Sequence, residues 1–193
     1  MGRVNISAEN QIERLNLLEA RMKKMEQKSL QELIKRPGEK SWSALEAIEH
    51  MNMGYIVYEP KIETALKQLS TSDPLTESVR STAIPSFLIK RFPPQKGKIR
   101  FKMKTMKSFQ PVLEINTIRE TELADYFERF YRSLDKLKEF ILAYRQTKVE
   151  KVRFNSAIGA IVKFNVAEAV EFILCHNERH CLQAEKALNI LEG

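Results

Sequence analysis

The chain has 193 residues, 43% of them hydrophobic and 30% charged, which is the composition of a folded globular protein and not of a disordered one. No apolar run approaches the roughly 20 residues of a transmembrane helix, and the charged start of the chain lacks the apolar core of a signal peptide. We therefore expect one domain over residues 1–193 in a cytoplasmic protein. Its cysteines, Cys175 and Cys181, lie too far apart on one predicted helix to pair, and we expect both to be reduced.

The formal net charge of +7 comes from one stretch of the chain. Residues 90–107 hold eight Lys and Arg and no acid, which leaves the rest of the chain close to neutral. Such a run is a solvated loop, or it attracts an anionic co-substrate or a nucleic-acid backbone. Phe92 and Phe101 are too few aromatic residues for a base-stacking platform. Nucleic-acid binding is therefore the least favoured function, and we expect neither a nucleic-acid nor a membrane partner.

Two helices are predicted in the first third of the chain, over residues 8–36 and 43–69. Apolar residues recur every three or four positions in both segments, which is the period of an amphipathic helix. A bend is expected near Ser29, and Pro37-Gly38 ends the first helix. Ser43 and Glu46 fit a capping box at the start of the second.

Residues 70–116 are predicted to be an irregular connection. Pro85, Pro93, Pro94 and Pro111 rule out one continuous helix, and Arg100–Lys104 alternates like a short exposed strand. A connection of this length is unusual in a compact bundle, and it indicates a long crossover or a functional loop.

Two further helices are predicted over residues 118–146 and 165–191, with another connection between them. Thr117 and Glu120 fit a capping box, and Asn165 with Glu168 fits a second one. Four long helices predict an all-α fold, a four-helix bundle with a long crossover between helices 2 and 3. That crossover permits helices 2 and 3 to run parallel, whereas the shorter links predict antiparallel neighbours.

The only three histidines of the chain fall on core-facing sides of two predicted helices. His176 and His180 are four residues apart, so their rings project from the same side of one helix. His50 lies on an inward strip of small residues of the second helix. The spacing permits a shared metal ion, and it equally permits three buried imidazoles that bond to backbone groups.

The motifs around these histidines resemble those of the DinB/YfiT-like superfamily of metal-binding four-helix bundles. The resemblance rests on Trp42-Ser43-x-x-Glu46-x-x-x-His50 and on His176-x-x-x-His180 with Gln183. Residues 102–111 and 153–156 also look like the segments that precede helices 3 and 4 in that superfamily. The resemblance covers nearly the whole chain, and it implies that His50, His176 and His180 are ligands of a divalent metal.

Three neutral imidazoles suit Zn, Ni or Fe, and three protein ligands leave a coordination position for water or substrate, as in catalytic sites. The resemblance implies a metal-dependent hydrolase, or a transferase that activates a low-molecular-weight thiol, acting on a small-molecule substrate. The alternative is a non-catalytic metal-binding bundle related to stress. Members of the superfamily are often dimers, and we expect a homodimer on that basis.

Four neighbours of the histidines have two interpretations each. Glu46 is an acceptor for an imidazole N–H or a catalytic base, or else only a capping residue. Gln183 orients a ligand or faces solvent, and we favour solvent. Trp42 anchors the helix by packing, which we favour, or forms a wall of a substrate pocket. Cys181 is more readily a buried thiol than a ligand. We expect Glu178 and Arg179, on the turn between His176 and His180, to lie on a solvated face or in a salt bridge.

Overall fold

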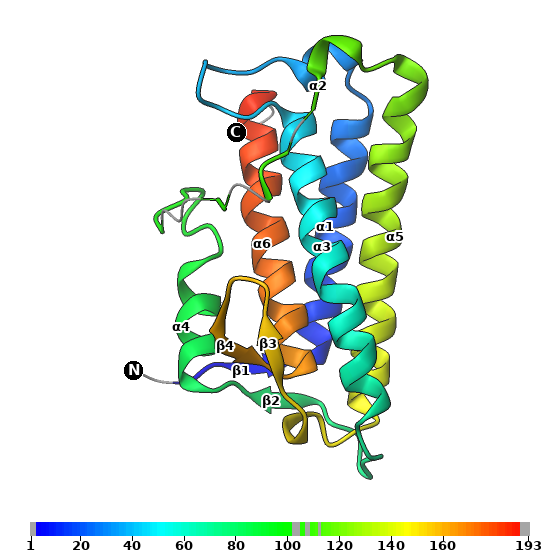
Figure 1. The fold of residues 1–193 in the computed structure, drawn as a ribbon, viewed down its shortest axis with the longest axis vertical. Helices are drawn as coiled ribbons and strands as arrows, with labels where there is room; N and C mark the ends of the chain where they lie inside the picture. Colours follow the sequence, from blue (N-terminus) through cyan, green and yellow to red (C-terminus); the bar gives the residue numbers. More distant parts are fainter. Residues whose placement is uncertain (1–2, 102–104, 107–108, 112, 190–193) are drawn as a thin grey trace.

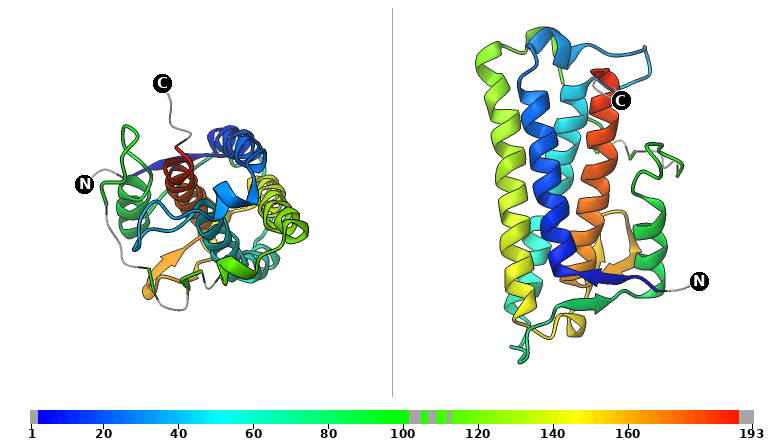
Figure 2. Two further views of the ribbon diagram at one scale, coloured as in Figure 1. Left: turned by 90° about the horizontal axis from the view of Figure 1, so that it is seen from above. Right: turned by 180° about the vertical axis from the view of Figure 1, so that it is seen from behind.

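The computed structural model describes residues 3–101, 105–106, 109–111 and 113–189. Within that part of the chain the protein is mostly helical, as the sequence predicts. Four long helices lie side by side along the molecule (Figures 1 and 2): α1 (Ala8–Glu26), α3 (Ala44–Lys67), α5 (Glu120–Arg145) and α6 (Val166–Ala187). Two shorter helices, α2 (Leu30–Ile34) and α4 (Ala83–Arg91), accompany them. None of the described helices combines the length and the hydropathy needed to cross a membrane.

The long helices run in two directions. In Figure 1, α3 and α5 run from top to bottom, whereas α1 and α6 run from bottom to top. The parallel pair α3 and α5 is joined by the long connection, and the shorter links join antiparallel helices, as the link lengths predicted. One side of α6 packs on α1 and α3, and α4 and a hairpin lie along another side. Residues are therefore buried around most of the circumference of α6.

The helix starts are fixed by side chains that satisfy the free N–H groups of the first turn. Ser43 and Glu46 form the predicted capping box of α3, and Asn165 and Glu168 form that of α6. The prediction for α5 was wrong, because this helix begins at Glu120 with Arg119 as its N-cap, two residues after the proposed N-cap Thr117. There the carboxylate of Glu122 accepts from the backbone N–H of Arg119, 2.8 Å away.

Three elements differ from the sequence-based prediction. The segment 8–36 is two helices, and the break falls at Ser29, which caps α2 near the predicted bend. Helix α4 lies inside the connection predicted to be irregular. It contains Pro85, which a helix tolerates in its first turn because the missing N–H has no partner there.

The third difference is the presence of two small antiparallel sheets. β1 (Asn5–Ser7) pairs with β2 (Ser78–Arg80), and β3 (Phe154–Ser156) pairs with β4 (Gly159–Phe164). These strands are too short for a reliable alternation of apolar and polar residues, and tertiary contacts such as the buried Ile6–Val79 pair stabilise them. The strand predicted at Arg100–Lys104 lies largely outside the described residues, as does the end of the helix predicted to reach residue 191.

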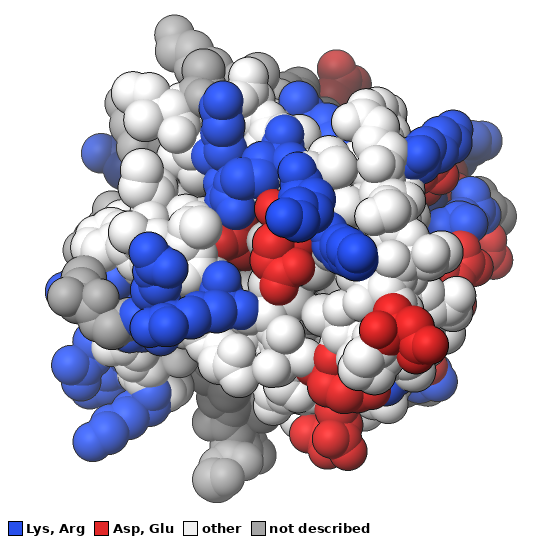
Figure 3. All heavy atoms as spheres, turned by 90° about the horizontal axis from the view of Figure 1, so that it is seen from below, with Lys and Arg blue, Asp and Glu red and all other residues white. Residues whose placement is uncertain are grey.

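Charge is divided among separate patches on the end of the molecule seen from below. Figure 3 shows Lys and Arg side chains there in several groups, with Asp and Glu side chains against more than one of them. The described residues of this face therefore do not form one continuous basic field of the kind that follows a nucleic-acid backbone.

A buried carboxylate joins the start of α6 to the outer elements. Glu168 is fully buried, and one of its oxygens accepts from the backbone N–H of Thr82, just before α4. Its other oxygen accepts from Arg153, which also donates to the carbonyl of Lys163 in β4. This network therefore holds α4 and the β3–β4 hairpin against α6.

Replacing Arg153 with alanine should destabilise the protein by about 3 kcal/mol, because the buried carboxylate of Glu168 loses its cation. The measurement is the midpoint of urea unfolding. Arg119→Ala is the matched control, since it removes an exposed ion pair with Glu122 and should cost less than about 1 kcal/mol. Equal effects of the two substitutions would show that the Glu168 network does not stabilise the fold.

Candidate metal centre

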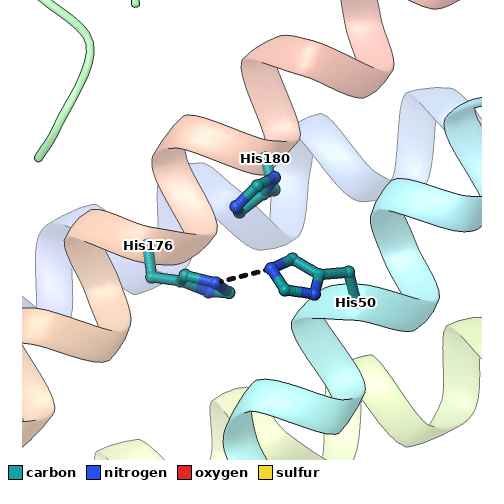
Figure 4. A group of neighbouring side chains, drawn as sticks. All are labelled: His50, His176 and His180. Carbon is teal, nitrogen blue, oxygen red and sulfur yellow. Dashed lines mark hydrogen bonds between the residues drawn. The ribbon is translucent and has the colours of Figure 1, made fainter. Parts of the chain in front are cut away.

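The three histidines meet between α3 and α6. His50 projects from α3, and His176 and His180 project from successive turns of α6 (Figure 4). One ring nitrogen from each lies within 4.8 Å of the other two, and Nε2 of His50 is 3.1 Å from Nε2 of His176. The sequence placed these residues on inward faces, and the structure brings all three together.

A glycine allows one of these rings to approach the neighbouring helix. Gly54 lies one turn after His50 on α3, and a Cβ atom at this position would be 3.1 Å from Cε1 of His176. That separation is tighter than nine in ten real Cβ contacts, so the ring would have to shift by a few tenths of an ångström. The imidazole of His176 therefore rests against α3 in space that any larger residue would occupy.

Hydrogen bonds on the far side of two rings set their tautomers. Nδ1 of His50 lies 2.7 Å from the carbonyl oxygen of Phe109, which can only accept, so this nitrogen is the N–H donor. Nδ1 of His180 lies 3.1 Å from Oε1 of Gln183 and donates to it in the same way. In a neutral ring the other nitrogen then has a free lone pair. Both Nε2 atoms are thus ready to act as ligands.

Burial keeps the imidazoles neutral. Loss of solvation is the largest influence on all three rings, and it lowers the pKa of His176 to about 3 and that of His180 well below its usual value. Burial also lowers the pKa of His50, although the Phe109 carbonyl opposes this shift. Neutral imidazole is the form that binds metal ions.

The spacing of the nitrogens fits a divalent metal. Two imidazole nitrogens at about 2.1 Å from a tetrahedral zinc lie about 3.4 Å apart, close to the 3.1 Å between His50 and His176. The nitrogens of the cluster lie up to 4.8 Å apart, so at least one ring has to move for all three to bind one ion. Two Nε2 atoms with free lone pairs would repel each other at 3.1 Å, so a proton or a cation must lie between them.

A cavity of about 310 Å³ opens beside the histidines. All three rings line it, and its walls are largely aromatic, with contributions from Trp42, Tyr58, Phe92, Phe109 and Phe172. The β3–β4 turn closes one side through Ala157 and Ile158. A small molecule in this cavity would lie directly against the imidazoles.

The described contacts bear on the interpretations of several neighbouring residues. Glu46 bonds to Arg36 and to the backbone N–H of Ser43, so its described contacts are those of a capping residue, and it does not line the cavity. Gln183 holds His180 and does not simply face solvent, contrary to the interpretation we favoured. Trp42 is a wall of the cavity, with its ring 4.8 Å from that of His50.

The two cysteines behave as predicted. Both thiols are free and buried, and neither belongs to the metal-binding cluster found among the described residues. Burial raises the pKa of Cys181 to about 12, so it stays protonated at neutral pH.

Sequence reasoning missed two contributors to the site. The Phe109 carbonyl is a backbone group, and no side-chain pattern reveals it. Arg179 was expected to face solvent or to join a salt bridge, as Glu178 does with Arg14. Instead Arg179 is 8% exposed and lines the cavity, and burial lowers the pKa of its guanidinium. The sequence did contain one indication of this placement: Arg179 follows His176 by three residues, and residues three apart lie close together on a helix surface.

Substituting alanine for Gly54 should weaken metal binding about ten-fold, because the new methyl group displaces the ring of His176. Helix propensity favours alanine over glycine by about 1 kcal/mol, so the fold should not lose stability in proportion. The measurements are zinc affinity and the thermal midpoint. Gly38→Ala is the control, since its Cβ would make an ordinary 3.7 Å contact. Unchanged zinc affinity in Gly54→Ala would show that the close approach does not position the ligand.

Comparisons of the chain with protein-family models, with curated proteins and with solved structures find no match. The resemblance to the DinB/YfiT-like superfamily therefore rests on the quoted motifs alone. The geometry of the three histidines and the adjoining cavity stands independently of that resemblance.

Proposed function

We propose that the protein is a metal-dependent enzyme that acts on a small molecule. The observation that supports this best is the open cavity beside the three imidazoles. A purely structural site would be closed by a fourth protein ligand. Among the described residues, the cluster has three His, Cys, Asp or Glu members and no fourth.

The fold belongs to the same proposal. We infer a four-helix bundle of α1, α3, α5 and α6, with a long crossover from α3 to α5, as in the DinB/YfiT-like superfamily. The parallel course of α3 and α5 supports this topology (Figure 1). The β3–β4 hairpin and Phe92, the residue after α4, are then additions that line the cavity on one side.

The chain's own residues account for binding and orientation. His50, His176 and His180 would hold a divalent Zn, Ni or Fe ion, and Phe109 and Gln183 fix the rings of His50 and His180. Bound there, such an ion supplies Lewis acidity and lowers the pKa of a water or a thiol towards neutrality. The aromatic walls exclude bulk water and receive the apolar part of a substrate.

Two reaction classes follow from this arrangement: hydrolysis, and transfer to a low-molecular-weight thiol. Neither needs a protein nucleophile, which agrees with the burial of both cysteines. The alternative, a non-catalytic metal-binding bundle, predicts bound metal without turnover. A homodimer and a cytoplasmic location stay predictions.

Each substitution His50→Ala, His176→Ala or His180→Ala should reduce bound metal from about one ion per chain to a small fraction of that, because two imidazoles alone hold zinc weakly. Metal content of untagged protein by mass spectrometry is the measurement. Cys181→Ala is the control, since it removes a buried side chain next to His180 on α6 but outside the cluster. Full metal content in a histidine variant would remove that residue from the ligand set.

The reaction is tested by incubating metal-loaded protein with small thiols and electrophiles, and separately with ester and amide substrates. Activity that EDTA abolishes and zinc, nickel or iron restores is the expected result. Stoichiometric metal with no turnover across both panels would favour the non-catalytic alternative.

A further inference from the structure

Arg179 is the one buried lysine or arginine among the residues that the structure describes. It projects from α6 between the turns that carry His176 and His180, and it lines the same cavity as they do. The other arginines packed against α6 are only partly buried, and each has a carboxylate partner. The pairs are Arg14 with Glu171 and Glu178, Arg21 with Glu185, and Arg153 with Glu168.

Arg179 has no such partner within the described part of the chain. One of its nitrogens, Nη1, donates to the carbonyl oxygen of Phe101 at 2.6 Å, and its guanidinium lies 5.2 Å from the centre of the Phe92 ring. A guanidinium has five N–H donors, so these contacts leave most of them free. The loop that approaches it offers no counter-ion, because residues 90–113 contain no Asp or Glu.

A buried charge without a partner carries a large desolvation penalty, and the other arginines on α6 avoid it by pairing. The charge of Arg179 adjoins a cavity, so its counter-ion would have to come from a molecule inside that cavity. Guanidinium groups match carboxylate and phosphate geometry through two parallel hydrogen bonds.

We propose that Arg179 binds the anionic group, a carboxylate or a phosphate, of a small substrate whose apolar body lies against the aromatic walls of the cavity. This inference names the substrate class of the proposed function and rests on that function. The ring of Phe92 lies against both the guanidinium and the imidazole of His176, which it stacks on at 6.1 Å. An anion held by Arg179 therefore presents the rest of the molecule to the histidines.

The test is calorimetric binding of benzoate and phenyl phosphate, with uncharged benzamide as the matched neutral probe. All three are measured on the full chain treated with EDTA and again on the zinc-loaded chain. The wild-type protein should bind at least one anion about ten-fold or more tightly than benzamide, even without metal, as expected for a charge-assisted hydrogen bond. The preferred probe tells a carboxylate from a phosphate site.

Arg179→Gln should abolish the preference for the anion and leave benzamide binding unchanged. Arg91→Gln is the control, because Arg91 is exposed, stacks on Phe87 and does not line the cavity. Arg179→Lys keeps the charge without the forked donors and should retain part of the preference. If the glutamine variant does not fold, the lysine variant and the wild-type comparison decide the question.

Equal binding of anions and benzamide by the wild-type protein would overturn the proposal, and so would an undiminished preference in Arg179→Gln. The metal-free measurements separate this inference from the metal site. An Arg179-dependent preference in a protein that binds no metal would refute the metal proposal alone. Bound metal without any anion preference would refute the role of Arg179 alone.

Discussion

The site depends on one constraint, which is that three imidazoles, two buried and one half-buried, must all be satisfied in the narrow space between α3 and α6. His50 and His180 each donate from Nδ1 to an oxygen, so their Nε2 lone pairs are directed into a shared space with His176. Neutral rings in this arrangement have unsatisfied acceptors facing each other. A cation at the point of convergence resolves this conflict, and a hydrogen bond between two of the rings resolves it only in part.

The surrounding elements keep this space both narrow and open. Gly54 removes the side chain that would separate α3 from His176, while Trp42 and Phe92 flank the rings. At the start of α6, the Glu168 network fixes α4 and the β3–β4 hairpin, whose turn lines the cavity together with Phe92, the residue after α4. Stability and chemistry are therefore linked through α6, since one of its faces builds the core and another builds the cavity.

The sequence predicted those features of the fold and the site that depend on helical periodicity and on local capping residues. The long helices, the capping boxes of Ser43 and Asn165 and the inward placement of the histidines all follow from spacing along one helix. It did not predict features that depend on tertiary contacts, namely the short strands, α4 with Pro85 in its first turn, and the hydrogen bond from His50 to the Phe109 carbonyl. Arg179 was misread because the described residues that contact its guanidinium, Phe92 and Phe101, come from the segment after α4, which helical spacing on α6 does not reveal.

X-ray absorption spectroscopy of the purified, metal-loaded protein is the most direct test of metal binding by the three histidines. Three imidazole ligands and one water or hydroxide ligand should give nitrogen and oxygen scatterers at about 2.0–2.1 Å, with the multiple scattering of imidazole rings. A sulfur scatterer near about 2.3 Å, or a metal surrounded by oxygen ligands alone, would contradict a site built from His50, His176 and His180.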